Sequence, residues 1–353
     1  MIRLVAQLVV ILAAALACLV RIPAAWVERL YSRGLYALVQ PRLTALSNAV
    51  PFALFDVLVL TTALLVARAA VRVACRPGRA LAVARLLIAL GTWTAAAYLV
   101  FFAVWGLNYQ RQPITTHLRF DAAAARPQAV AALGAEAVRQ LNRLRDEAHR
   151  QGFPEWRAMP AVMGPAFQAT VAHLAPGLRP NPGLPKWSLL SFYFRYAGIS
   201  GMTDPFTLEI LVDRSQLPFE RAFVTAHEWA HLAGYADEAE ANFVGWLTCM
   251  RGRAPEAYSG WIFALFETLH ALPRDERATL VRSLAPGPRA DLAAITARAQ
   301  RIQPILQSFS WRIYDQYLKA NRVEHGVRSY GRVLVLMLGT RFADGWIPVT
   351  VGN

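Results

Sequence analysis

Three long apolar runs dominate the first third of the chain and lie at about residues 4–20, 51–67 and 86–107. The second run is interrupted only by Asp56, and the third contains no charged residue. A helix of about 20 mostly apolar residues crosses the hydrocarbon core of a bilayer. The pattern therefore predicts a membrane region over residues 1–108 with three transmembrane helices. Because the first run lies near the lower length limit, a cleavable signal peptide is the alternative for that segment.

The distribution of arginines indicates how these helices cross the membrane. Residues 68–85 contain five arginines and no acidic residue, and short loops rich in Lys and Arg stay on the cytoplasmic side. Residues 21–50, which belong to the opposite side, carry four arginines and one acidic residue, so the bias is modest. Three crossings then place residues 109–353 on the extracytoplasmic side of a multi-pass protein of the cell membrane.

Residues 109–353 have the mixed pattern of one folded domain. Residues 121–151 are amphipathic with a helical period, and a helical period returns from Pro218 to about residue 340. It is interrupted at Gly252, Pro273, Pro286 and Gly326. The last apolar run, residues 333–338, is too short to span a bilayer, and we assign it to the core.

Two runs with the composition of β-strands follow the Pro/Gly-rich loop at residues 176–186. They are Ser188–Tyr196 and Pro205–Val212, and the turn residues Gly198-Ile-Ser-Gly201 and Asp204-Pro205 lie between them. We therefore expect a mainly α protein with a small β-sheet, an α+β fold. The run Pro205–Val212 is either the sheet edge that pairs with an extended peptide substrate or an ordinary sheet strand.

Composition and charge narrow the class of protein. Hydrophobic residues make up 56% and charged residues 17% of the 353 residues, which excludes a disordered or fibrous chain. The net charge of +14 comes almost entirely from arginines that are scattered along the chain. This pattern favours a lipid bilayer with anionic headgroups over a nucleic acid as partner. Three cysteines in or beside apolar segments predict no structural disulfide.

Candidate chemistry is concentrated in His227-Glu228-Trp-Ala-His231, which lies in a helical pattern that ends at Gly234. Histidines four residues apart share one face of a helix, so both imidazoles can bind one zinc ion, Zn²⁺. Glu228 falls beside that face, where it can deprotonate a water molecule without binding the metal itself. The motif therefore predicts His227 and His231 as metal ligands and Glu228 as the catalytic base.

A third ligand is expected from the segment that follows. Asp237 and Glu240 have the spacing of a helix cap, in which Glu240 reaches back to the backbone of the capping residue. Glu238 then lies in the first turn, and Asn242 lies one turn later on the same face. We expect Glu238 to bind the metal and Asn242 to hydrogen-bond a ligand histidine. Glu240 is the alternative ligand, and plain solvation at the helix start is the alternative for both glutamates.

These motifs resemble those of two families. His227-Glu-x-x-His231 followed by Glu238-x-x-Ala-Asn242 is similar to the two-helix site of gluzincin metallopeptidases, in which Asp is usual where this chain has Asn. The whole chain also resembles the bacterial membrane family known as domain of unknown function 3810. That resemblance rests on Trp105-Gly-Leu-Asn-Tyr109, Gly198-Ile-Ser-Gly201, Pro205-Phe-Thr-x-Glu209, both site motifs, Tyr314-Asp-x-Tyr-Leu-Lys319 and Gly326-Val-Arg-Ser-Tyr330. It implies a zincin-like domain over residues 109–353.

The combined pattern predicts a membrane-anchored zinc metalloendopeptidase that acts on peptide or protein substrates. The alternative is a non-catalytic membrane scaffold or assembly factor with a structural or vestigial zinc site. A structural site usually takes a fourth ligand such as Cys, but Cys249 lies about three helical turns beyond Glu238. Candidates for stabilising the oxyanion are Tyr317, His325, Arg328 and Tyr330. Cleavage specificity and oligomeric state have no signal in the sequence.

Overall fold

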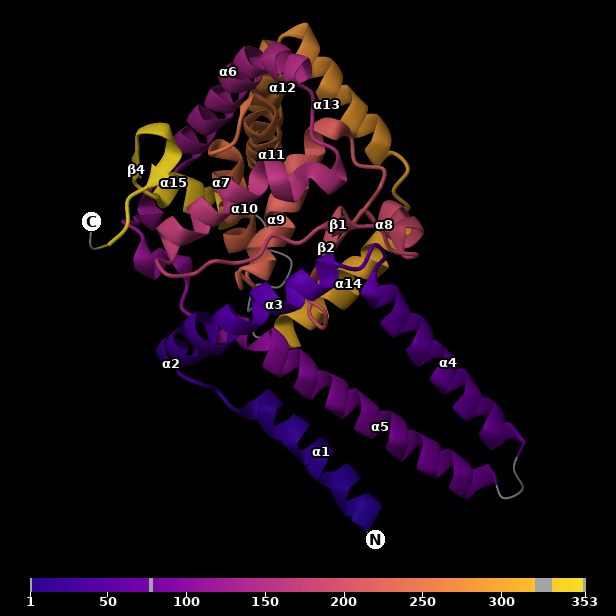
Figure 1. Ribbon diagram of the computed structural model, residues 1–353. Coiled ribbons are helices and arrows are strands. Elements are labelled where there is room, and N and C mark those ends of the chain that lie inside the picture. Colours follow the sequence, from indigo (N-terminus) through magenta and orange to yellow (C-terminus); the bar gives the residue numbers. More distant parts are fainter. Residues whose placement is uncertain (1, 76–78, 321–331, 352–353) are drawn as a thin grey trace.

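The computed structural model describes residues 2–75, 79–320 and 332–351 and is mainly helical (Figure 1). The N-terminal third consists of helices α1 (Ile2–Leu19), α2 (Ala24–Trp26), the π-helical η1 (Val27–Leu35), α3 (Tyr36–Asn48), α4 (Leu54–Ala74) and α5 (Arg79–Val104). Helices α1, α4 and α5 project from one side of the folded domain that the later residues form (Figure 1).

Two of these helices, α4 and α5, are long and apolar enough to cross a membrane. They correspond to the second and third apolar runs, and α4 buries no residue against the protein. A third span is present only if Leu4–Leu19 and Ala24–Asn48, which meet at a bend of 110°, count together as one broken span. The described residues therefore contain two or three helices that are long and apolar enough to span a bilayer.

The segment between the first two apolar runs is a helical layer that packs on the domain. The hydroxyl of Tyr36 donates to the carbonyl of Leu232 at 2.8 Å, and the hydroxyl of Thr44 donates to the carbonyl of Leu208 at 2.8 Å. Gln40, which is also fully buried, bonds the backbone of Asn181. Part of the predicted membrane region thus forms one wall around the helix that carries the histidines.

The later residues form ten α-helices, besides short 3₁₀ turns, within the described ranges. These are α6 (Pro127–Gln151), α7 (Met159–Leu174), α8 (Ser191–Ala197), α9 (Arg221–Leu232), α10 (Glu238–Met250), α11 (Ala254–Ala271), α12 (Arg274–Ser283), α13 (Pro286–Ala299), α14 (Pro304–Ala320) and α15 (Val333–Gly339). The expected helical region after Pro218 and its breaks at Gly252, Pro273 and Pro286 are confirmed, whereas Gly326 lies outside the described residues. The run at residues 333–338 is buried in α15, as predicted.

A three-stranded sheet consists of β1 (Pro185–Lys186), β2 (Gly201–Asp204) and β3 (Glu209–Val212), in the order β1-β3-β2. Strand β3 pairs in parallel with β1 and antiparallel with β2. It is therefore the central strand, and the edge beside α9 is β2. Of the two alternatives for Pro205–Val212, the sheet edge is wrong and the ordinary sheet strand is confirmed, because β3 is paired on both sides.

The prediction of a strand at Ser188–Tyr196 is also wrong, since Ser191–Ala197 forms helix α8. Its aromatic residues favour strands in general, but that preference reflects packing and not the backbone itself. Here Phe194 and Ala197, three residues apart, bury one helical face. A second sheet of β4 (Phe342–Ala343) and β5 (Ile347–Pro348) has strands too short for a pattern to predict.

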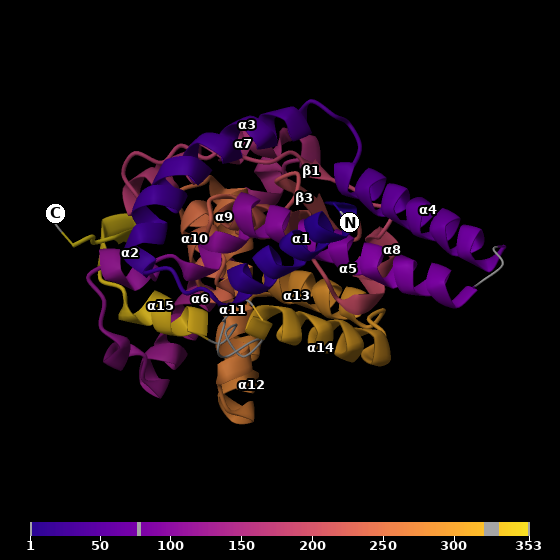
Figure 2. The ribbon, with the colours of Figure 1, turned by 90° about the horizontal axis from the view of Figure 1, so that it is seen from below.

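Helices α9 and α10 pack closely at the centre of the domain (Figures 1 and 2). Trp229 of α9 and Trp246 of α10 are completely buried. Gly245 permits the close approach, because a Cβ atom there would lie 3.0 Å from the backbone nitrogen of His227. The fold therefore places the two motif-bearing helices against each other in the core.

Candidate metal centre

Helix α9 ends where the sequence indicates. Gly234 has a φ of +85°, a conformation that favours glycine. The next backbone N–H, that of Tyr235, returns to the carbonyl of Ala230 at 3.1 Å. His227 and His231 therefore occupy the last two turns of the helix on one face, and the chain turns back immediately afterwards.

Helix α10 begins at the predicted cap. The carboxylate of Asp237 accepts hydrogen bonds from the backbone N–H groups of Ala239 and Glu240, which leaves Glu238 in the first turn. Glu240 does not reach back to the cap as expected. Its buried carboxylate instead accepts from the N–H of Ile114 at 2.7 Å, and burial raises its pKa to about 7. Glu240 is thus occupied by a distant loop, while Glu238 faces the histidines.

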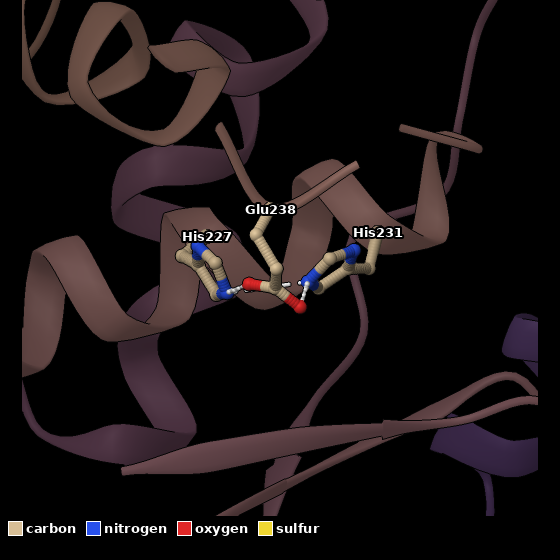
Figure 3. A group of neighbouring side chains, drawn as sticks. All are labelled: His227, His231 and Glu238. Carbon is tan, nitrogen blue, oxygen red and sulfur yellow. Dashed lines mark hydrogen bonds and ion pairs between the residues drawn. The ribbon is translucent and has the colours of Figure 1, made fainter. Parts of the chain in front are cut away.

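The three predicted ligands converge on one point (Figure 3). The Nε2 atoms of His227 and His231 are 3.2 Å apart, and the Glu238 oxygens lie 3.5 Å and 3.6 Å from these two nitrogens respectively. Ligand atoms held tetrahedrally about 2.0–2.2 Å from a zinc ion are about 3.4 Å from one another. The spacing of the side chains therefore fits a zinc ion bound by two nitrogens and one oxygen.

The outer nitrogens of the two imidazoles have different surroundings. Nδ1 of His231 lies 2.8 Å from the carbonyl oxygen of Tyr235, to which it can only donate, so Nε2 of the neutral ring is left to bind a metal. Asn242 is buried beside His227 and favours its protonated form. Nδ1 of His227 has no hydrogen-bond partner among the described residues, and the bond from Asn242 to a ligand histidine stays a prediction.

The charges of the three ligand side chains depend on one another. Burial and the neighbouring His231 lower the pKa of His227 to about 4. Burial alone would lower the pKa of His231, but the carboxylate of Glu238 outweighs it and raises the pKa to about 9. Burial likewise opposes ionisation of Glu238, yet the charge on His231 lowers its pKa to about 2. Without metal, the site therefore holds one proton between His231 and Glu238.

Glu228 lies next to this cluster on a separate set of contacts. Its carboxylate accepts from the hydroxyl of Thr203 at 2.8 Å, and a Cβ atom at Gly201 would lie only 2.6 Å from its Oε1. Burial raises the pKa of Glu228 to about 7. Strand β2 thus fixes a carboxyl group that exchanges protons near neutral pH.

Two contacts to the centre come from residues that the motif analysis did not select. The hydroxyl of Tyr314, on α14, donates to Oε1 of Glu238. Trp105, directly after α5, donates from its indole nitrogen to the carbonyl of His231 at 3.1 Å and meets that imidazole edge to face. Both residues belong to motifs that carry the family resemblance, which is the signal that identifies them. The side chain of Tyr317 and residues His325, Arg328 and Tyr330 lie outside the described part of the chain.

Comparison with known proteins identifies the family. The family described as protein of unknown function (DUF3810) matches residues 31–338. No curated protein and no solved structure matches the chain significantly. The matched range begins in η1 and ends in α15, so it contains both helices of the candidate metal centre. The chain therefore belongs to the DUF3810 family of proteins of unknown function.

Proposed function

We propose that this protein is a membrane-anchored zinc metalloendopeptidase of the gluzincin type. The observation that carries the proposal is the convergence of His227, His231 and Glu238 at the spacing of tetrahedral zinc ligands, with Glu228 beside them. Three protein ligands of this kind are typical of catalytic zinc sites, which leave the fourth position to water or substrate.

The side chains divide the chemical work as follows. Zinc, when bound, would polarise a peptide carbonyl and lower the pKa of water to about 7. Glu228 accepts the proton of the attacking water and then delivers it to the amine that leaves. Its pKa of about 7 suits both transfers, because the group is neither fully protonated nor fully ionised at neutral pH. Thr203 keeps the carboxylate oriented during both steps.

The substrate is expected to bind along β2. This strand lies at the edge of its sheet, and Gly201 and Thr203 within it contact Glu228. An extended peptide added to that edge would run past the catalytic base. Pairing of this kind involves mainly the backbone, which agrees with an enzyme that cuts within polypeptides.

A structural zinc site is less well supported. Among the residues that the structure describes, three metal-binding side chains gather at this point. Cys249 is buried on α10 and lies against Gly260 of α11, not near the ligands. The arginine bias further supports an extracytoplasmic location for the enzyme.

Purification of the full chain in lipid nanodiscs tests the proposal. We expect about one zinc ion per chain and hydrolysis within members of a peptide library. Glu228→Gln should keep the zinc and lose at least about 100-fold in rate, because it removes the proton acceptor but no ligand. Equal hydrolysis by both proteins, or zinc without hydrolysis of any peptide, would reject the peptidase function.

A further inference from the structure

Exposed apolar side chains gather on and just before α8 and on α14, two helices that lie beside the start of α4 (Figure 1). We call them the α8–α14 face, which consists of Leu189, Phe192, Ile305, Phe309 and Ile313. Phe192 is 72% and Ile305 is 86% exposed, which is costly in water for side chains of this size. An open cavity of about 530 Å³ lies between the two helices and is lined mainly by apolar groups.

This face is continuous with a membrane-spanning helix. Asp56, in the first turn of α4, accepts hydrogen bonds from Ser188 and from the backbone of Leu189. Helix α14 is in turn joined to α8, because the hydroxyls of Tyr193 and Ser310 lie 2.7 Å apart. The α8–α14 face therefore begins where α4 leaves the domain.

The two faces of α14 differ in a way that suits an interfacial helix. Ile305, Phe309 and Ile313 repeat every four residues and form one exposed stripe. Arg301 and Arg312 are exposed nearby, where they can meet anionic headgroups. The opposite side carries Tyr314, which donates to the metal ligand Glu238.

The metal centre is also close to the end of a spanning helix. Trp105 follows the last residue of α5, and its ring centroid lies 6.3 Å from that of His231. A scissile bond at the metal must therefore come close to the membrane surface.

We propose that the α8–α14 face is inserted into the interface of the lipid bilayer, and that the centre consequently acts on polypeptides anchored in, or emerging from, that bilayer. The second part of this inference rests on the proposed peptidase function, whereas the first part does not.

Spin labels on the full chain test the membrane contact directly. Ile305→Cys and Phe309→Cys are labelled in a Cys18→Ser, Cys75→Ser background and placed in phosphatidylethanolamine and phosphatidylglycerol nanodiscs. The control is Ile347→Cys on β5, which is 37% exposed and pairs with β4, a strand that lies away from α4 and α5 (Figure 1). We expect collisions with a water-soluble nickel chelate to be about tenfold rarer at positions 305 and 309 than at position 347. Equal collision rates at the three positions would overturn the proposal.

A second experiment tests the substrate class. A fluorogenic peptide is offered either with a double lipid anchor in the same bilayer or free in solution. Ile305→Glu combined with Phe309→Glu should lose about tenfold in hydrolysis of the anchored peptide and hydrolyse the free peptide as the wild type does. Ile347→Glu is the matched control and should change neither rate. Equal loss on both peptides, or no loss on either, would refute the substrate class. If the wild type cleaves neither peptide, the peptidase function fails, while the spin-label result still decides the membrane contact.

Discussion

Gly201 provides the sharpest test of the role of Glu228. A Cβ atom at this position would lie 2.6 Å from Oε1 of Glu228 and 3.0 Å from its Cγ and Cδ. Ordinary contact begins near 3.4 Å, so Gly201→Ala forces the carboxylate to withdraw by about 0.8 Å. The displaced group is the end of a side chain, so the fold should tolerate the change. Its hydrogen bond from Thr203, now 2.8 Å, would be distorted at the same time.

The expected loss follows from this displacement. A misplacement of about 1 Å in a reacting group costs on the order of 100-fold in rate, or about 3 kcal/mol in activation free energy. The three atoms nearest to the new methyl group all belong to Glu228 and none to the proposed zinc ligands, so zinc content should stay at the wild-type value. We therefore expect a lower kcat with unchanged metal. The assay combines peptide hydrolysis in nanodiscs with metal analysis by mass spectrometry and a thermal melt.

A matched substitution controls for the general effect of replacing glycine. A Cβ atom at Gly91, on α5, would meet nothing within 4 Å, so Gly91→Ala should leave kcat unchanged. If Gly201→Ala retains kcat within about threefold of the wild type at equal zinc content, then the position of Glu228 does not limit the reaction and its assignment as base is refuted.

Three further predictions concern the metal, stability and topology. Because the pKa of His231 is raised to about 9, zinc must displace a proton from this site at lower pH. Each unit fall in pH below 9 should therefore lower the apparent zinc affinity about tenfold. A zinc affinity that does not change with pH in competition titrations would contradict the shared proton. Burial raises the pKa of Glu267 from 4.5 to about 7. Below about pH 4.5 the carboxyl group is protonated in both the folded and the unfolded protein, and as the pH rises through 7 it ionises in its buried site, which lowers the stability of the folded state. The free energy of unfolding of Glu267→Gln should therefore be up to about 3 kcal/mol higher than that of the wild type at about pH 8 and equal to it at about pH 4. Equal melting temperatures of variant and wild type at both pH values would refute this prediction. Alkaline phosphatase fused to the C-terminus should be active, because its disulfides form only after export. Fluorescence from a cytoplasmic reporter fused at the same place would instead contradict the predicted topology.

Local patterns in the sequence determined several features of this protein. The apolar runs specify α4 and α5 because spanning length is a property of one segment. Gly234 ends α9 and Asp237 begins α10 because each acts on backbone groups within a few residues. These two boundaries and the helical spacing of the histidines predict that one glutamate from the start of α10 meets His227 and His231, with Glu238 favoured and Glu240 as the alternative.

Only the tertiary structure decided the remaining partners. Glu240 bonds Ile114, and Tyr314 bonds Glu238, across separations of 126 and 76 residues. The aromatic segment at α8 became a helix because Phe194 and Ala197 found a buried surface there, and β3 became a central strand because β1 reached its other side. Such outcomes depend on burial against distant elements, and a sequence pattern encodes the apolar face of a segment but not the surface that covers it.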